Sequence, residues 1–471
     1  MTALPTPQHL HLLRRATFGP TPASLAELSH LGSRRWLDRQ LHPASIPDPL
    51  GDRLVKRFPR LALSTEQRRA SLSGAGKFAC VTDLTALTIG RAVWSSRQLQ
   101  EMMTSTWADH FSVFNGPDLW DCRASLDHDA VRPNALGRFE HLLSAVVRHP
   151  AMLKFLSADQ STAAAPNENL GRELLELHTV GLASGFSEAD VKASAKVLTG
   201  LSVGPDGAMT YRPERHYVGP LRVLGWSAAN ASPGAGPQVL SSYLHYLAHH
   251  PATAANVARR LAVRFVSDAP SAALVHRLAE NYLASGTRID VVLRALFSSH
   301  EFAASHGAKV RRPFEDIAAT YRVLGCRPAS HGTAGLATLV WVSAQSGNQP
   351  LSWPQPNGYP DVASAWASPS GQVARWTMHY NAASGGWTRA LHTPPLRALL
   401  PATLPGTWAE LVDALTTRLT FTRWKPAHRA ALLSFLGRSA HERVHALDWS
   451  TTSKLPELVA LVLGSPYFQV R

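Results

Sequence analysis

The stretch from Pro166 to Gly181 of this 471-residue chain holds the residue types best suited to chemistry. It contains three glutamates, one arginine and one histidine, spread over about three helical turns. Proline and asparagine at its start and glycine at its end predict a helix. At about 100° per residue, Glu173 falls between the apolar Leu177 and Val180, so we expect its carboxylate to be buried. Burial of a carboxylate is costly unless a cation, a metal ion or a hydrogen-bond donor meets it.

The neighbours of Glu173 supply further candidates for a site. Arg172 and Glu176 lie on the polar flank of the same predicted helix, and we predict that they act with Glu173 as catalytic residues. His178 borders the apolar side at the edge of this helix, where it is one candidate metal ligand.

Histidines from other parts of the chain suggest what could meet Glu173. His110 lies in the apolar face of a helix predicted from Arg91 to Phe114, His216 lies on a predicted loop, and His250 directly precedes a proline. Imidazole and carboxylate ligands together suit iron, manganese, zinc or copper, and two histidines with one carboxylate leave positions open for substrate or oxygen. We therefore predict a transition-metal site with ligands from this set: His110, Glu173, His178, His216 and His250.

Two other arrangements of these residues stay open. Glu173 could pair with a buried arginine such as Arg14 or Arg138, while His110 donates to a backbone carbonyl, and no His-Glu-x-x-His spacing decides against this. A cysteine nucleophile at Cys122 is a weaker alternative, because no base can be assigned to it. The sequence contains no phosphate-binding loop, no nucleophile elbow and no dinucleotide-binding fingerprint.

The elements that must position these residues are mainly helices. Apolar residues repeat at helical spacing along most of the chain, which predicts a mainly α, multi-helical single body. Residues 201–226 are the least helical, and we expect a short β-hairpin or an irregular loop region there. Residues 349–369 alternate prolines with aromatic side chains and predict an extended crossover. We therefore divide the chain into a helical core (1–348), this crossover (349–369) and a C-terminal helical portion packed on the core (370–471).

Composition limits the class of protein. Hydrophobic residues make up 45% of the chain, enough for a sizeable core, and the formal net charge of +14 suits an anionic partner. The three cysteines lie far apart without metal-binding spacing, which favours reduced thiols. Because no targeting segment and no membrane-spanning apolar run is visible, we expect a cytoplasmic protein.

Five motifs of this chain occur together in one known family: residues 11–20 (HLLRRATFGP), 107–111 (WADHF), 167–178 (NENLGRELLELH), 250–254 (HPATA) and 311–315 (RRPFE). Through these motifs the chain resembles the bacterial domain-of-unknown-function 1800 family. It covers nearly the whole chain and implies a helical fold but no settled reaction. Relatives commonly carry histidine at position 108, an acid at 217 and phenylalanine at 178, where this chain has Ala108, Tyr217 and His178.

From these features we expect a metal-dependent enzyme, an oxidoreductase rather than a hydrolase, that acts on a small-molecule or anionic substrate. The alternative is a non-catalytic helical interaction protein that binds an anionic partner through a basic face, including Arg57, Arg60, Arg68 and Arg69. Nucleic acid is not favoured as that partner, because basic runs alone are weak evidence. The sequence sets neither the identity of the metal nor the oligomeric state.

Overall fold

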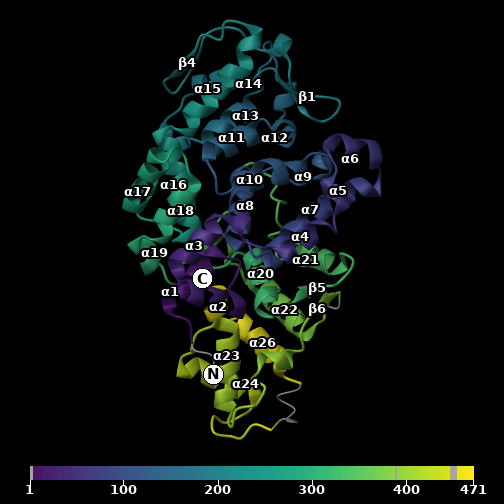
Figure 1. The fold of residues 1–471 in the computed structure, drawn as a ribbon, viewed down its shortest axis with the longest axis vertical. Coiled ribbons are helices and arrows are strands. Elements are labelled where there is room, and N and C mark those ends of the chain that lie inside the picture. The colour runs from purple at the N-terminus through teal and green to yellow at the C-terminus, as the bar shows by residue number, and fades with distance from the viewer. Residues whose placement is uncertain (1–3, 388–389, 446–452) are drawn as a thin grey trace.

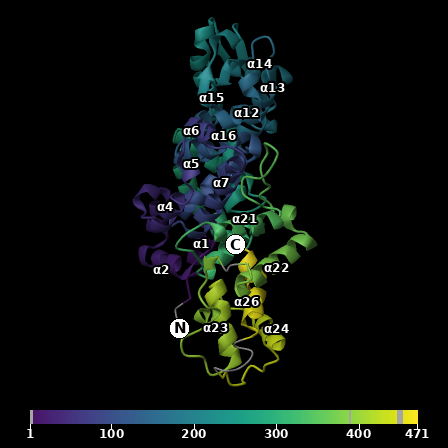
Figure 2. The same cartoon turned by 90° about the vertical axis from the view of Figure 1, so that its right-hand side faces the viewer.

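The structure is a computed structural model that describes residues 4–387, 390–445 and 453–471. Figures 1 and 2 show an elongated molecule built almost entirely from helices, which confirms the predicted mainly α, multi-helical fold. Within the described ranges, the strands form three small two-stranded antiparallel sheets. None of the described helices is both long enough and apolar enough to cross a membrane.

Two groups of helices form the middle of the molecule (Figure 1). The first group comprises α1 (Pro7–Ala16), α2 (Pro22–Leu31), α3 (Ser33–Leu41), α4 (Pro49–Val55), α5 (Pro59–Ala62), α6 (Thr65–Ser71), α7 (Ala75–Trp94), α8 (Gln98–His110), α9 (Arg123–Ser125) and α10 (Arg132–Asn134). The second group comprises α16 (Pro251–Phe265), α17 (Ala272–Ala284), α18 (Ile289–Phe297), α19 (His300–Ala304), α20 (Pro313–Val323) and α21 (Ala334–Gln345).

One end of the molecule is formed by residues 139–248 (Figure 1). Its elements are α11 (Phe139–Val147), α12 (Pro150–Phe155), α13 (Glu168–Glu173), α14 (Glu188–Leu198), β1 (Leu201–Val203), β2 (Met209–Tyr211), β3 (Leu221–Val223), β4 (Trp226–Ala228) and α15 (Gly236–Ala248). Here β1 pairs with β2 and β3 with β4, which confirms the predicted hairpin region. Ser187 and Asp190 form the capping box that their spacing indicates, so α14 begins directly after Ser187.

The opposite end is formed by the C-terminal portion (Figures 1 and 2). Its elements are α22 (Pro369–Ser384), α23 (Trp408–Thr420), α24 (Pro426–Leu436), α26 (Leu455–Leu463) and α27 (Pro466–Gln469). A short sheet of β5 (Arg327–Pro328) and β6 (Leu391–His392) ties this portion to the middle. Buried apolar residues from all three regions belong to one continuous core.

The helix predicted from Arg91 to Phe114 is wrong in extent, because α7 ends at Trp94 and α8 begins at Gln98. The carboxylate of Asp48 accepts hydrogen bonds from the Ser95 hydroxyl at 2.6 Å and from the next backbone amide at 2.9 Å. The second of these bonds satisfies a backbone donor that a continuous helix would have paired within itself. A contact with a distant residue therefore overrides the periodic pattern.

The crossover, residues 349–369, connects the middle of the molecule to the C-terminal portion. It lacks regular structure apart from a 3₁₀ turn at Ala363–Trp366, as its prolines predict. The Leu351 carbonyl accepts a hydrogen bond of 2.8 Å from the Asn115 amide, which holds the start of the crossover close to the end of α8. The division into domains on either side of it stays a prediction.

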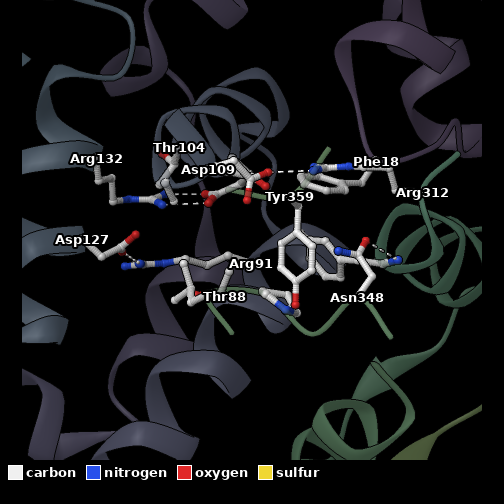
Figure 3. Close-up of a pocket in the computed structure, with 17 residues that line it drawn as sticks. Phe18, Thr88, Arg91, Thr104, Asp109, Asp127, Arg132, Arg312, Asn348 and Tyr359 are labelled. Atoms are coloured by element: carbon white, nitrogen blue, oxygen red, sulfur yellow. Dashed lines mark hydrogen bonds and ion pairs between the residues drawn. The ribbon is translucent and has the colours of Figure 1, made fainter. Parts of the chain in front are cut away.

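Glycine at position 358 lets the crossover approach α8 closely. The backbone of Gly358 has φ of +69°, and a Cβ there would lie 1.9 Å from the carbonyl oxygen of Asp109. No L side chain fits in that space without backbone movement. The approach brings the next residue, Tyr359, to face Arg91 across a cavity (Figure 3).

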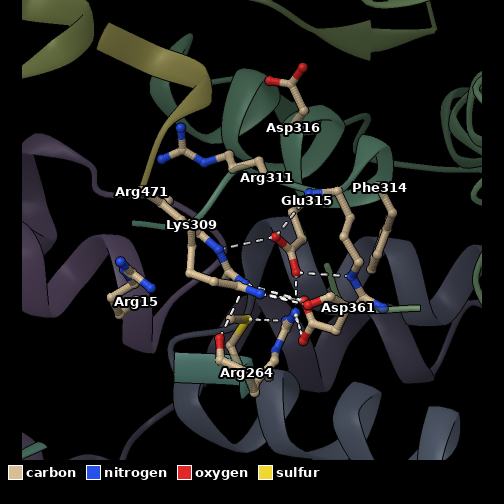
Figure 4. Close-up of polar contacts among 12 residues, drawn as sticks. Arg15, Arg264, Lys309, Arg311, Phe314, Glu315, Asp316, Asp361 and Arg471 are labelled. Carbon is tan, nitrogen blue, oxygen red and sulfur yellow. Dashed lines mark hydrogen bonds and ion pairs between the residues drawn. The ribbon is translucent and has the colours of Figure 1, made fainter. Parts of the chain in front are cut away.

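A buried ion network joins the crossover to three other parts of the molecule (Figure 4). Glu315, in the first turn of α20, is 2% exposed and contacts Arg264 of α16, Arg312 at 3.2 Å and Arg471 at 3.4 Å. The crossover contributes Asp361, whose carboxylate lies 3.2 Å from Arg264. Burial opposes the charged form of Glu315, but the three guanidinium groups outweigh it and hold its pKa well below the usual range.

We expect Glu315→Gln to destabilise the protein by about 3–5 kcal/mol, because it leaves guanidinium groups buried without their counter-charge. Urea unfolding followed by circular dichroism measures this. The matched control is Asp413→Asn, which breaks a half-exposed ion pair of 2.7 Å with Arg429 and should cost less than about 1 kcal/mol. Equal costs for the two variants would show that the network does not stabilise the fold.

A second prediction concerns the close approach of the crossover. Gly347→Ala places a methyl group in open space at φ of +73° and should cost about 1 kcal/mol, the penalty for left-handed backbone alone. Gly358→Ala has a similar φ but meets the Asp109 carbonyl, so we expect a further cost of roughly 1–3 kcal/mol. The same unfolding assay compares them, and equal costs would contradict the close approach.

Candidate metal centre

Two of the predicted metal ligands are occupied by local hydrogen bonds. His216 is buried, and its ring nitrogens lie 2.8 Å from the Thr199 carbonyl and 2.8 Å from the Asn230 side-chain oxygen. His250 caps the start of α16, where its Nδ1 accepts a hydrogen bond from the Ala252 amide at 3.1 Å. Both histidines therefore hold local backbone in place, and only Nε2 of His250 stays free of these bonds.

His110 and His178 are the two predicted ligands that the structure brings together. His110 Nε2 donates to the His178 carbonyl at 3.0 Å, and His178 Nδ1 donates to the His110 carbonyl at 3.1 Å. The His110 ring is buried against Phe111 and Phe139, and the His178 ring is buried against Phe111. Burial lowers the pKa of His110 well below its ordinary value and that of His178 to about 4, so both rings are neutral. The predicted bond from His110 to a backbone carbonyl is thus present.

The prediction that His178 lies at a helix edge and Glu173 inside the apolar face is wrong, because the helix does not continue regularly. α13 ends at Glu173, and Leu174–His178 form a π-helical turn with more residues per turn than an α-helix. The wider turn rotates His178 into the core, where it is fully buried, and leaves Glu173 half-buried. Partial burial and the neighbouring Glu176 raise the pKa of Glu173.

The other groups of this helix face outward. Arg172 forms a bidentate pair with Glu188, with both distances 2.7 Å, on an exposed surface. Glu176 is half-buried, and no polar contact of its side chain is seen in the described part of the chain. Arg14 and Arg138 donate to backbone carbonyls instead of pairing with Glu173. The predicted catalytic set of Arg172, Glu173 and Glu176 therefore lies on one helix surface without converging on a cavity.

Cys122 does not have the surroundings of a nucleophile. Its side chain is fully buried, and burial raises the pKa of the thiol to about 12. A thiol in that state is not ionised near neutral pH.

Three potential metal ligands converge at a different place. Among the described residues, ligand atoms of Glu140, His245 and His249 form the group of three that lie within 4.8 Å of one another. Glu140 lies in the first turn of α11, His245 lies in the last turn of α15, and His249 caps the end of α15, which packs against α11. His245 Nδ1 is 2.8 Å from one Glu140 oxygen, and His249 Nε2 is 3.9 Å from the other. The predicted His110, Glu173 and His216 do not form such a group.

The hydrogen bonds of this cluster suit metal binding. His249 Nδ1 donates to the His245 carbonyl at 3.0 Å, which fixes the proton on Nδ1 and leaves a lone pair on Nε2. A ligating histidine commonly has its other ring nitrogen bound in this way. The side chains of Glu140 and His249 are 28% and 31% exposed, so they are partly shielded and still accessible to an ion. The residues present therefore fit a two-histidine, one-carboxylate site.

A hollow of about 430 Å³ adjoins the cluster. Both His245 and His249 line it, and its remaining walls are formed by Trp226, Ser242, Tyr246, His250 and Pro251. Trp226 is fixed there by a hydrogen bond of 3.2 Å from its indole nitrogen to the Ser242 hydroxyl. A small molecule in this hollow would lie beside the two histidines.

The sequence contained part of the signal for this cluster. His245 and His249 are four residues apart, the spacing that places two imidazoles on one face of a helix, as in zinc sites of the His-x-x-x-His type. Glu140 carried no such signal, because more than a hundred residues separate it from the histidines. Only the packing of α11 against α15 brings the carboxylate to them.

Comparison with known proteins assigns the family. A family model described as a protein of unknown function (DUF1800) matches residues 11–470. The chain belongs to the DUF1800 family. No curated protein and no solved structure matches it. The DUF1800 match confirms the predicted resemblance over nearly the whole chain, and the family description supplies no activity.

The buried state of His178 predicts how stability depends on pH. The folded-state pKa is about 4 and the ordinary value 6.5, so the unfolded chain binds a proton first as the pH falls. This side chain should therefore lower the free energy of unfolding by roughly 3 kcal/mol between pH 6.5 and pH 4. We expect His178→Phe to lose correspondingly less stability over that range, as measured by urea unfolding at several pH values. His276→Phe, at an exposed position on α17, should follow the unmodified protein, and parallel curves for His178→Phe would contradict the buried neutral ring.

Proposed function

We propose that this protein is a metal-dependent enzyme whose transition-metal ion is held by Glu140, His245 and His249. The observation that carries the proposal is the convergence of these three ligand atoms within 4.8 Å, beside a hollow large enough for a small molecule. Two histidines and one carboxylate suit iron, manganese, copper or zinc and leave coordination positions open. When bound, such an ion supplies redox or Lewis-acid chemistry at those positions.

The walls of the hollow favour an oxidoreductase over a hydrolase. Two histidines and one carboxylate are typical ligands of iron in oxygen-activating enzymes, and the residues that line the hollow add no carboxylate that could serve as a general base for hydrolysis. His250 does not fill that role, because its Nδ1 accepts a backbone hydrogen bond and the proton must lie on Nε2. Burial also lowers the pKa of His250, so the ring is a neutral donor that can hold an oxygen atom of a substrate.

The alternative of a basic docking face has less support, because the arginines assigned to it make internal contacts. Arg57 donates to the Ala329 carbonyl at 2.6 Å, Arg60 pairs with Asp83 at 2.7 Å, and Arg69 pairs with Asp121 at 2.6 Å. Arg68 is buried and donates to three backbone carbonyls. These four side chains hold the segment 53–77 against the rest of the fold, so their charges are used in internal contacts.

Metal binding tests the proposal directly. Protein purified without a histidine tag, offered ferrous iron, manganese, copper and zinc in turn and then desalted, should retain about one equivalent of its preferred ion. Glu140→Ala and His249→Ala should each lower the affinity by about 100-fold or more, since each removes one of three protein ligands. Elemental analysis and competition with a chelator of known affinity give both quantities. On ferrous iron, nitric oxide binding followed by electron paramagnetic resonance reports the open coordination positions.

The controls distinguish this site from other histidines. His276→Ala removes an exposed histidine that lies 3.6 Å from Glu280 on one helix turn without a second histidine, so metal retention should be unchanged. His110→Ala and Glu173→Ala should also retain the ion, because neither residue belongs to the cluster. Loss of metal in either of these two variants, with retention in His249→Ala, would place the site elsewhere. Retention of no metal at all would refute a metal-dependent enzyme.

A further inference from the structure

A second cavity lies in the middle of the molecule, and it shares no lining residue with the candidate metal centre. It is lined by α7, α8, the π-helical turn Leu126–Val131 and the crossover, with Tyr359 forming one wall (Figure 3). Its volume is about 30 Å³ for the centres of water-sized molecules, which is room for two or three waters. Covalently bonded atoms lie closer together than water molecules do. A ligand can therefore have a few more non-hydrogen atoms than these two or three waters and still occupy a similar volume. We call this cavity the Arg91 chamber.

Most charged groups around the Arg91 chamber are paired. Arg132 makes a bidentate contact with Glu101, and Arg312 donates to Asp109 at 2.7 Å. These pairs satisfy the acids and guanidinium groups on the side of α8 (Figure 3). Because Glu101 and Asp109 are both bound by arginines, neither carboxylate is free to bind a cation.

Arg91 and Asp127 form a longer ion pair than these two (Figure 3). Both residues are buried, and their nearest approach is 3.8 Å, between Arg91 Nη1 and an Asp127 oxygen, too long for a hydrogen bond. In the described part of the chain, neither side chain makes a hydrogen bond. The buried hydroxyl of Thr104, which also lines the chamber, has no partner either. Burial lowers the pKa of Arg91, the direction expected for a guanidinium largely removed from water.

Arg91, Asp127 and Thr104, whose side chains lack hydrogen bonds in the described part of the chain, set the chemistry of an occupant. Buried polar groups almost always have hydrogen-bond partners, and a guanidinium presents parallel N–H groups that match the two oxygens of a carboxylate. Asp127 accepts hydrogen bonds and would meet a hydroxyl or an amino group of the same molecule. Phosphate fits less well, because its charge would lie beside Asp127 without a donor to offer that carboxylate.

We propose that the Arg91 chamber binds a compact carboxylic acid that carries a hydroxyl or amino group. The carboxylate accepts two hydrogen bonds from Arg91, and the hydroxyl or amino group donates to Asp127. Thr104 supplies a further hydrogen bond at the wall of the chamber. This site is independent of the ion at Glu140, His245 and His249, since it shares no residue with that cluster.

Four small probes test the proposal on the full-length, metal-free protein by isothermal titration and by chemical-shift changes of the ligand. Glycolate carries the hydroxyl, glycine carries the amino group, acetate carries the carboxylate alone, and ethylene glycol carries hydroxyls alone. We expect glycolate or glycine to bind with a Kd in about the millimolar range. Acetate should bind at least about tenfold more weakly, and ethylene glycol should give no saturable signal. Binding of glycolate alone identifies a hydroxy acid, and binding of glycine alone identifies an amino acid.

Variants connect the binding to the chamber. Arg91→Gln should abolish saturable binding, and Asp127→Asn should reduce the advantage of glycolate or glycine over acetate. Thr104→Val, a milder change of similar shape, should weaken binding and guards against a folding defect in the other two, which circular dichroism checks. Arg429→Gln, which changes an arginine of a half-exposed ion pair in the C-terminal portion, should bind like the unmodified protein. The proposal is overturned if none of the probes binds to folded protein, or if binding persists unchanged in folded Arg91→Gln.

Discussion

The buried carboxylate of Glu315 binds together segments that lie far apart in the chain. It belongs to α20, and its three guanidinium partners come from α16, from the residue before α20 and from the last residue of the chain. Each of these ions is stable in the interior only because the others are present. Through Asp361 the same network fixes the crossover, and the crossover in turn forms the wall of the Arg91 chamber.

Part of the net charge of +14 belongs to basic side chains that lie inside the molecule. Basic side chains inside the molecule exceed the acids that they contact, and several of them are satisfied by backbone carbonyls. Arg15, for example, is fully buried and donates to the carbonyls of Phe265, Val266 and Ser305. Guanidinium groups can join loops and helix ends in this way because they offer many donors in fixed directions. A high content of arginine is thus partly a structural feature of this fold.

Local patterns in the sequence predicted local structure well. The hairpin region at 201–226 depends on contacts between residues close in sequence, and it is present. The prediction that His178 lies at a helix edge was wrong, because it assumed a constant rotation of about 100° per residue. The chain changes to a π-helical turn at this point. The predicted helix across Ser95 failed because Asp48, distant in sequence, competes for its hydrogen bonds. The mainly α class was therefore predictable, whereas the junctions between helices were not.

The candidate site shows the same limit more sharply. A histidine in a sequence signals a potential ligand, but whether its nitrogens are free depends on hydrogen bonds that only the fold determines. His216 has both nitrogens occupied, and His110 and His178 each hold the other's backbone. His245 and His249 differ because they lie on the outer face of α15, where the packing of α11 supplies Glu140 and leaves a lone pair on His249 directed at the cluster. His110 and His178 also have a second ring nitrogen without a hydrogen bond. The feature that distinguishes the candidate ligands His245 and His249 is therefore the packing of α11 against α15, which brings a carboxylate to them.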